Sequence, residues 1–518
     1  DDGCIVTGVD RWSAAVDRLD EAAIPRTLTG VLQARFDVLS EDGRRSLQRA
    51  SIVGRTFWDS AVEALGSQPT DLEQAVGNEL VFLQGPSAFP ETSEFMFKHA
   101  LLHDVAYDTV LLSERPALHH RAAQWLNDAV GERRDEYLEE IAGHLLLADK
   151  TDQAAGLLIE AAARSLNSGD APSARRLADA AFAASDTVAA DGNGHLLLAK
   201  ACRLMGDLGT AEQEADRELQ LAEATGDDAA IIAALHEAFF VSETQGTHVR
   251  GRALVGRGLP IAERLGGTSL TRMLACSAWS DLNAGDLDGA RQSAAANLQR
   301  AEEDGDGAIL IEALKINANV ASAVGNHGEA LDHERRVLEL AAASGNLTEL
   351  AVGYLNTGVS RHYLADLSGE EGDYARAQSE YEEALVLTRR LGFRAYEAQA
   401  LGNLAQLRMR QGQPDAGQTL AKECLRVTNA IGAHTHALFA VLVHAEATFE
   451  ATGSTDALTH IGVVRSDPAL GRLLAEVSDV IDRLRISHPD VAIDHHLDAG
   501  VSLDFDDVVE SILSDPSP

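Results

Sequence analysis

The chain has 518 residues, which is too long for one compact core, so several domains or an elongated array are expected. Its formal charge of −38 disfavours general binding to the phosphate backbone of nucleic acids. An apolar fraction of 45% excludes wholesale disorder, and abundant alanine, leucine and glutamate favour helices. The acidity fits either a high-salt habitat or an acidic, soluble surface encoded by a GC-rich genome, and composition leaves both open.

The cysteine and hydropathy patterns predict a cytoplasmic protein without membrane partners. The cysteines form no CxxC motif and no disulfide framework, which fits a reducing compartment. No apolar run approaches the roughly 20 residues that cross a membrane, and no signal peptide opens the chain. The chain starts at Asp1 instead of methionine, which indicates a piece of a longer protein. The cysteines are Cys4, Cys202, Cys276 and Cys424.

Residues 1–24 are interpreted as a lead-in from a missing upstream domain. It is expected to hold a strand near Ile5 and a short helix from Trp12 to Leu19.

Residues 25–130 predict a winged-helix-like domain. Helices are expected first, because apolar residues recur three and four apart after Pro25 and a second apolar run ends at Gly54. Two short apolar runs around a turn-rich loop then predict a strand pair. The ranges are 72–79 for a third helix, 80–84 and 94–99 for the strands, 101–112 and 116–129 for later helices, and 131–150 for a transition helix.

Several segments of this domain resemble the region after the ATPase module in bacterial signal-transduction ATPases with tetratricopeptide tails. Members of that family include adenylate or guanylate cyclase-like proteins and LuxR-type regulators. The matching segments are Ile24-Pro25-Arg26-Thr27-Leu28, Ala34 to Leu39, Ala50 to Phe57 and Phe97 to Tyr107. The resemblance implies that His99, at the end of the second strand, approaches a bound nucleotide; a structural histidine at a strand–helix junction is the alternative.

The nucleotide-binding core of that family is missing from this chain. No GxxxxGK[ST] phosphate loop occurs, and a helical array cannot replace the backbone amides of such a loop. The resemblance therefore places ATP or ADP with Mg²⁺ in an upstream domain. The chain itself is predicted to have no enzymatic activity, no cofactor and no catalytic residue.

Residues 151–465 predict a solenoid of about eight tetratricopeptide-like helical hairpins. Turn glycines recur with a period near 40 residues, and a fixed period of this size is typical of repeat arrays. Ordinary tetratricopeptide repeats have 34 residues, so helices longer by about a turn are expected. The turn glycines are Gly169, Gly206, Gly246, Gly285, Gly325, Gly372, Gly412 and Gly453.

Small residues seven before and five after five of these glycines would let the two helices of a hairpin approach closely, as in tetratricopeptide repeats. The hairpin at Gly246 departs from this register with Phe239 in the first small position, and the hairpin at Gly453 loses both positions. An insertion of roughly seven residues within 364–371 delays one turn. Residues 466–518 are expected to form a capping helix at 473–484, an acidic loop over 490–507 and a last short helix.

Polar residues on the predicted first helices are candidates for binding a protein or peptide partner, because polar groups in the groove of such an array can hydrogen-bond an extended peptide. An ordinary wet surface is the alternative. These candidates are Asn317, Asn319, Asn356, Arg361, Asn403, Gln406 and Arg410.

Histidine patterns give little support for a metal site. His99 and His103 are four apart beside Asp104, but two ligands without a third do not make a site. The pair His119-His120 is predicted to lie on the surface.

Three functions are consistent with these observations. The first is a regulatory, non-catalytic segment in which a winged helix couples an upstream ATPase switch to a repeat sensor. The second is part of a class III nucleotide cyclase whose catalytic domain lies upstream. The third is a plain scaffold for protein assembly.

Overall fold

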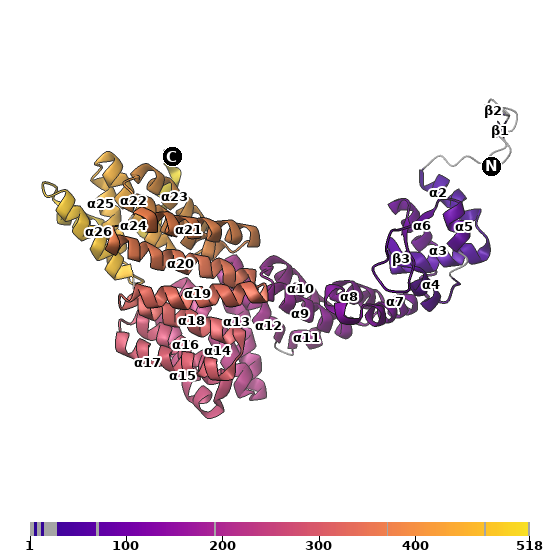
Figure 1. Ribbon diagram of the computed structural model, residues 1–518, viewed down its shortest axis with the longest axis horizontal. Helices are drawn as coiled ribbons and strands as arrows, with labels where there is room; N and C mark the ends of the chain where they lie inside the picture. Colours follow the sequence, from indigo (N-terminus) through magenta and orange to yellow (C-terminus); the bar gives the residue numbers. More distant parts are fainter. Residues whose placement is uncertain are drawn as a thin grey trace. The chain divides into compact units, whose positions relative to one another are not determined.

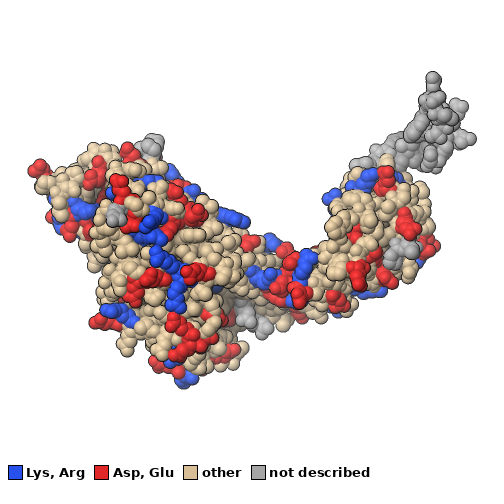
Figure 2. All heavy atoms as spheres, in the orientation of Figure 1, with Lys and Arg blue, Asp and Glu red and all other residues tan. Residues whose placement is uncertain are grey.

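The computed structural model describes residues 5–7, 12–14, 28–68, 72–190, 193–369, 371–470 and 473–515 (Figure 1). The chain divides into two compact units, residues 1–161 (unit 1) and 162–518 (unit 2). Acidic side chains are spread over the visible surface of both units, with basic ones between them (Figure 2). None of the described helices is both long and apolar enough to span a bilayer.

Unit 1 begins with a small antiparallel hairpin. Strand β1 (Ile5–Thr7) pairs with β2 (Trp12–Ala14), so that Thr7 lies opposite Trp12. The helix predicted from Trp12 is therefore wrong for its first three residues, because these backbone groups pair with a neighbouring strand. Cys4, Pro25 and residues 15–19 lie outside the described residues.

The middle of unit 1 combines short helices with a three-stranded antiparallel sheet in the order β3-β5-β4. The strand pair predicted at 80–84 and 94–99 is confirmed as β4 and β5, whereas β3 and α4 were missed because each spans only a few residues. The elements are α2 (Leu28–Asp37), α3 (Glu41–Val53), β3 (Thr56–Trp58), α4 (Asp59–Ala64), α5 (Leu72–Gly77), β4 (Val81–Leu83) and β5 (Glu94–Phe97).

The later helices of unit 1 bury His119, which was expected on the surface together with His120, against His144. His119 Nδ1 lies 3.0 Å from His144 Nδ1, and its Nε2 lies 3.0 Å from the Tyr107 hydroxyl. Burial, reinforced by His144 and Arg115, lowers the pKa of His119 to about 4 and keeps the ring neutral. The surface prediction is wrong for His119. These helices are α6 (Ala100–Asp108), α7 (Arg115–Ala129), η2 (Gly131–Glu136) and α8 (Leu138–Leu147).

Unit 2 is a mainly α repeat superhelix of tetratricopeptide type, as predicted, in which each first helix packs against its second helix and the next repeat (Figure 1). Helices α9 (Thr151–Asn167), which crosses the unit boundary, and α10 (Ala171–Ala184) come first, followed by the short α11 (Asp186–Ala190). The later first helices are α12 (Asn193–Met205), α14 (Asp228–Gln245), α16 (Gly267–Asn283), α18 (Gly307–Ala323), α20 (Leu347–Ser368), α22 (Arg394–Arg410) and α24 (His434–Thr452). The second helices are α13 (Leu208–Thr225), α15 (His248–Leu265), α17 (Leu287–Asp304), α19 (His327–Ser344), α21 (Glu371–Leu391), α23 (Pro414–Ile431) and α25 (Asp456–Ser466).

A glycine with positive φ ends most of these helices. Gly206, Gly226 and Gly246 adopt φ of 85°, 71° and 79° at intervals of 20 residues. Only glycine enters this left-handed region without a Cβ penalty. Helices of 17 or 18 residues plus a two-residue turn account for the period near 40, which confirms the expectation of longer helices.

The residue after the turn glycine caps the next helix. The Asp207 carboxylate accepts a hydrogen bond from the backbone N–H of Thr210 at 3.2 Å, and Asp286 accepts one from Gly289 at 3.0 Å. An Asp or Asn here satisfies a backbone donor that has no partner within the helix. The recurring Gly-Asp pair thus ends one helix and starts the next.

The insertion lengthens both helices of its hairpin. Helix α20 has 22 residues and α21 has 21, and the turn glycine is Gly369, with φ of 70°. The predicted turn at Gly372 is wrong, because Gly372 lies inside α21. Because Gly369 and Gly372 lie within four residues, the spacing of glycines alone does not indicate which of them forms the turn.

Both irregular hairpins form. At Gly246, Phe239 is fully buried; a Cβ on Gly251 would collide with the Glu243 carboxylate and lie in ordinary contact, 3.4 Å, with the Phe239 ring. At Gly453, φ is 71° and Leu458 is buried in the hairpin core. In the hairpin at Gly246, the glycine in the second helix thus leaves room for side chains of the first helix.

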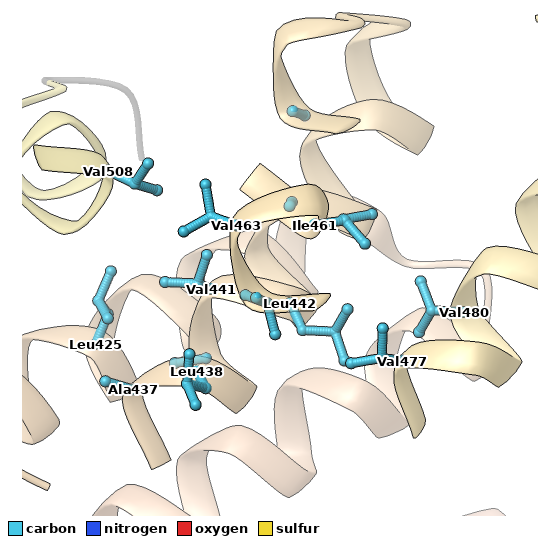
Figure 3. Packing of buried hydrophobic residues seen from close by; sticks show 14 of the residues in the cluster. Leu425, Ala437, Leu438, Val441, Leu442, Ile461, Val463, Val477, Val480 and Val508 are labelled. Carbon is cyan, nitrogen blue, oxygen red and sulfur yellow. The ribbon is translucent and has the colours of Figure 1, made fainter. Parts of the chain in front are cut away.

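The C-terminal end is closed by a hydrophobic cluster that joins α24 and α25 to α26 (Leu474–Ser487), α27 (Ile493–Gly500) and α28 (Phe505–Ser514). In Figure 3, Leu442 lies between Ile461 and Val477. The predicted capping and last helices are confirmed, but the acidic loop is wrong over α27. Its apolar residues Ile493 and Leu497 are buried and keep this segment helical.

Helices α25 and α27 cross with their backbones in contact at Gly462 and Gly500. A Cβ on Gly462 would lie 2.1 Å from the Leu497 carbonyl oxygen. We expect Gly462→Ala to separate the helices, lower the thermal midpoint in circular dichroism and expose residues 493–515 to limited proteolysis.

The control is Gly372→Ala. Nothing lies within 4 Å of a Cβ at this position inside α21, so the change is expected to stabilise by about 0.5–1 kcal/mol. A Gly462→Ala protein that melts and is digested like the wild type would contradict the backbone contact.

Candidate functional site

One stripe of mostly polar side chains, half-buried except for the exposed Lys200, follows each first helix from α12 to α22. On α22 these residues recur at intervals of three and four, which places them on one side of the helix. We call the set of stripes the inner face. It comprises Lys200 and Arg203 on α12, His236, Phe240 and Glu243 on α14, Arg272 and Trp279 on α16, Glu312, Lys315 and Asn319 on α18, Glu349 and Asn356 on α20, and Tyr396, Gln399, Asn403, Gln406 and Arg410 on α22.

A buried ion pair joins the first two helices of the inner face. The Arg203 guanidinium donates to both carboxylate oxygens of Glu237 on α14, at 2.6 and 3.4 Å, and lies 5.7 Å from the Phe240 ring centre. Burial opposes the charge on Arg203, but the Glu237 carboxylate and a hydrogen bond with Tyr396 outweigh it and raise the pKa of Arg203. Since Tyr396 lies on α22, the early and late repeats of unit 2 meet here.

A second pair spans two repeats. His236 on α14 hydrogen-bonds Glu312 on α18. Burial would raise the pKa of Glu312, but His236, together with Lys315 and Arg272, outweighs burial and holds it at about 2. Glu312 therefore stays ionised at neutral pH.

A third pair extends the network to the sixth repeat, at α20. Lys315 Nζ donates to Glu349 Oε2 at 2.8 Å, while the two side chains keep 25% and 22% of their exposure. Solvent therefore still reaches this part of the inner face. The three pairs tie helices α12, α14, α18 and α20 together with satisfied charges.

Sequence reasoning missed this network, although it left a signal. Arg203–Glu237 and Lys315–Glu349 are each 34 residues apart, and the pairs Glu302–Arg336 and Arg389–Glu423 on second helices have the same separation. This sequence separation is six residues shorter than the repeat length of about 40 residues. Opposite charges at that spacing would have indicated contacts between neighbouring repeats.

Four of the predicted binding residues are already engaged. Asn317 donates to the backbone oxygens of Ala294 at 2.9 Å and Ala313 at 2.8 Å, and Asn319 donates to its own helix at 2.8 Å. Arg361 pairs with Glu380 on α21 at 2.6 Å.

The fourth engaged residue, Arg410, lies on α22, the last helix of the inner face. Arg410 pairs with Asp366 on α20 at 3.3 Å and with Asp479 on α26 at 2.9 Å. These contacts hold helices together and give the four residues structural partners.

The other three predicted residues differ from these. Within the described ranges, no side chain or backbone group hydrogen-bonds the amides of Asn356, Asn403 or Gln406, and all three are half-buried. Asn356 lies on α20, and the other two lie one turn apart on α22, which packs against α20. The structure thus brings three free amide groups onto neighbouring first helices.

His99 lies in unit 1 at the N-cap of α6, exposed and without a side-chain capping bond. Its neighbour His103 is engaged, with Nε2 3.0 Å from the Ser51 carbonyl oxygen and Nδ1 3.1 Å from Asp104. Among the described residues, no three His, Cys, Asp or Glu side chains are grouped to hold a metal ion.

A buried carboxyl group lies between α19 and α20. Glu334 is 4% exposed, and the Ser360 hydroxyl donates to its Oε1 at 3.0 Å. Burial raises the pKa of Glu334 to about 8, so the group is mostly protonated at neutral pH.

Replacing Arg203 tests the buried network. Arg203→Gln would leave Glu237, whose side chain is 6% exposed, as an uncompensated charge, which costs about 3–5 kcal/mol. Arg336→Gln removes an exposed pair of the same sequence separation and should cost less than about 1 kcal/mol. Urea unfolding of both variants measures the difference; equal costs would contradict a buried network.

Glu334 makes stability depend on pH. The unfolded carboxyl ionises above its ordinary pKa of 4.5, whereas the folded one keeps its proton to about 8, so stability falls as pH rises through this window. We expect Glu334→Gln to raise the urea midpoint at pH 8 and to leave it nearly unchanged at pH 5. The exposed Glu383→Gln is the control, and a Glu334→Gln effect independent of pH would refute the assignment.

Comparisons with known proteins concern the fold. No family model and no curated protein matches the sequence. A signal-transduction ATPase with numerous domains and a tetratricopeptide repeat sensor, from Pyrococcus horikoshii, is 13% identical with a TM-score of 0.38, and the match covers 96% of this chain but only 64% of that one. A Rap protein complexed with competence and sporulation factor is 13% identical (TM-score 0.49, 70% of this chain, 99% of that one). NprR with its cognate peptide NprX is 12% identical (TM-score 0.45, 66% and 97%).

Proposed function

We propose that the inner face of unit 2 binds an extended peptide, or an extended segment of a partner protein, and that the chain is a non-catalytic sensor. The observation that carries this proposal is the set of three unpartnered amides, Asn356, Asn403 and Gln406, on neighbouring first helices. They are half-buried, so water solvates them less well than a free surface group.

The chemistry of a side-chain amide matches a peptide backbone. Each amide offers two N–H donors and a carbonyl acceptor, and can pair with the C=O and N–H of one residue in an extended chain. Such bonds favour any extended backbone, and specificity then comes from the side chains of the peptide. Three amides on two adjacent helices would hold several residues of the bound chain.

The ion-pair network supports the same reading. Arg203–Glu237, His236–Glu312 and Lys315–Glu349 satisfy one another, which fixes the first helices relative to each other before a ligand arrives. A preorganised site loses less conformational entropy on binding. These charges therefore support the site without having to contact the peptide.

Unit 1 is proposed to relay the signal. Its order of helix, strand, two helices and two strands, from α3 to β5, supports a winged-helix arrangement. We propose that it couples the array to an upstream ATPase domain that holds ATP or ADP with Mg²⁺. The exposed His99 at the start of α6 would contact the nucleotide. Peptide binding biases such a switch only if its affinity differs between the two states.

The test removes the free amides together. The purified chain is incubated with a degenerate hexapeptide library, and retained peptides are quantified by mass spectrometry after size exclusion. We expect Asn356→Ala/Asn403→Ala/Gln406→Ala to lose at least about tenfold in retention, since each lost hydrogen bond is worth about 0.5–1.5 kcal/mol.

The matched control is Asn429→Ala, an exposed amide on the second helix α23. It should retain peptides like the wild type. Undiminished retention by the triple variant, with a wild-type unfolding midpoint, would refute the proposed role of these amides.

A further inference from the structure

One half-buried cation of the inner face has no ion-pair partner among the described residues. Arg272 on α16 is half-buried, yet no carboxylate in the described part of the chain lies within ion-pairing distance of it. Its charge helps to lower the pKa of Glu312, so it lies near that carboxylate, but Glu312 is hydrogen-bonded to His236. The guanidinium of Arg272 thus remains available.

This property sets Arg272 apart from the other basic residues of unit 2. On first helices α12 to α22, the described cations other than Arg272 and the exposed Lys200 form ion pairs. The remaining described arginines of unit 2 without an ion pair lie exposed on second helices. These are Arg217, Arg252, Arg291, Arg300, Arg390 and Arg426.

An unpaired, half-buried guanidinium is unusual in a chain with 81 acidic and 43 basic residues. Partial burial weakens its hydration, and no carboxylate among the described residues makes up the loss. An anionic group delivered by a ligand would form charge-assisted, bidentate hydrogen bonds with it.

On this basis, which rests on the proposed peptide-binding function, we propose that Arg272 receives a carboxylate of the bound peptide, either its C-terminus or an Asp or Glu side chain. A planar carboxylate matches the two parallel N–H groups of a guanidinium.

The net charge favours a single carboxylate over a polyanion. A ligand with many phosphates would experience the repulsion of a chain with charge −38, whereas one carboxylate at Arg272 interacts mainly with charges within a Debye length of about 8 Å. Arg203 and Lys315 have carboxylate partners of their own, whereas Arg272 has none within ion-pairing distance among the described residues.

The experiment uses three hexapeptide pools that differ only in their carboxylates. The first has free C-termini and no Asp or Glu, the second has amidated C-termini and one Asp or Glu, and the third has neither carboxylate. We expect the wild-type chain to retain the first or the second pool about tenfold better than the third, because charge-assisted hydrogen bonds are stronger than neutral ones.

Two substitutions assign the preference. Arg272→Gln should abolish the preference for carboxylate-bearing peptides, so that all pools are retained about equally. Arg272→Lys should keep part of this preference because the charge remains. Arg300→Gln, which removes an exposed unpaired arginine on α17, should leave it intact. Urea unfolding verifies that every variant is folded as the wild type is.

The outcomes separate this inference from the proposed function. Equal retention of all three pools by the wild type, or an undiminished preference in Arg272→Gln, would overturn the carboxylate site and leave peptide binding standing. Failure of the wild type to retain any pool would overturn both.

Discussion

The repeat array depends on a backbone constraint: its helices end about every 20 residues at a glycine in the left-handed conformation. At Gly206, Gly226 and Gly246 the positive φ stops one helix, and the next residue starts another. Because the interval is nearly constant, equivalent positions on successive helices stay aligned. The stripe that forms the inner face is a product of this alignment, since a drift of one residue would rotate side chains by about 100° around a helix.

Regular spacing also explains the ion pairs. When repeats stack in register, a side chain on one helix meets the corresponding helix of the next repeat at a fixed sequence distance. Arg203–Glu237 and Lys315–Glu349 use the separation of 34 residues on first helices, and Glu302–Arg336 uses it on second helices. The exposed pairs contribute little, whereas the buried ones make adjacent repeats depend on each other. Stability in such an array is a sum of repeats and their interfaces.

The sequence predicted the features that local chemistry determines. Glycine spacing indicated the hairpins, and apolar runs indicated β4 and β5. The predictions failed where tertiary contacts determine the structure. Gly369 and Gly372 were both plausible turn residues. Helix α27 forms because Ile493 and Leu497 are buried, and His119 is buried against His144. The same limit applies to the candidate site. Sequence placed seven polar residues on first helices. Only packing shows which amides are already bonded and that Arg272 has no ion-pair partner in the described part of the chain.

Polar groups of the inner face fall into two classes: those with hydrogen-bond or ion-pair partners stabilise the array, and those without partners are available to a ligand. A groove whose charges were all unpaired would be unstable, since each half-buried charge would lack compensation. A groove whose polar groups were all paired would offer a peptide nothing to bind. In this chain, Arg203, His236 and Lys315 are satisfied, while Asn356 and Arg272 are free. A neutral amide costs less to leave unpaired than a charge, so free amides can be several, whereas a free guanidinium on the inner face is best kept to one position where an anion is expected.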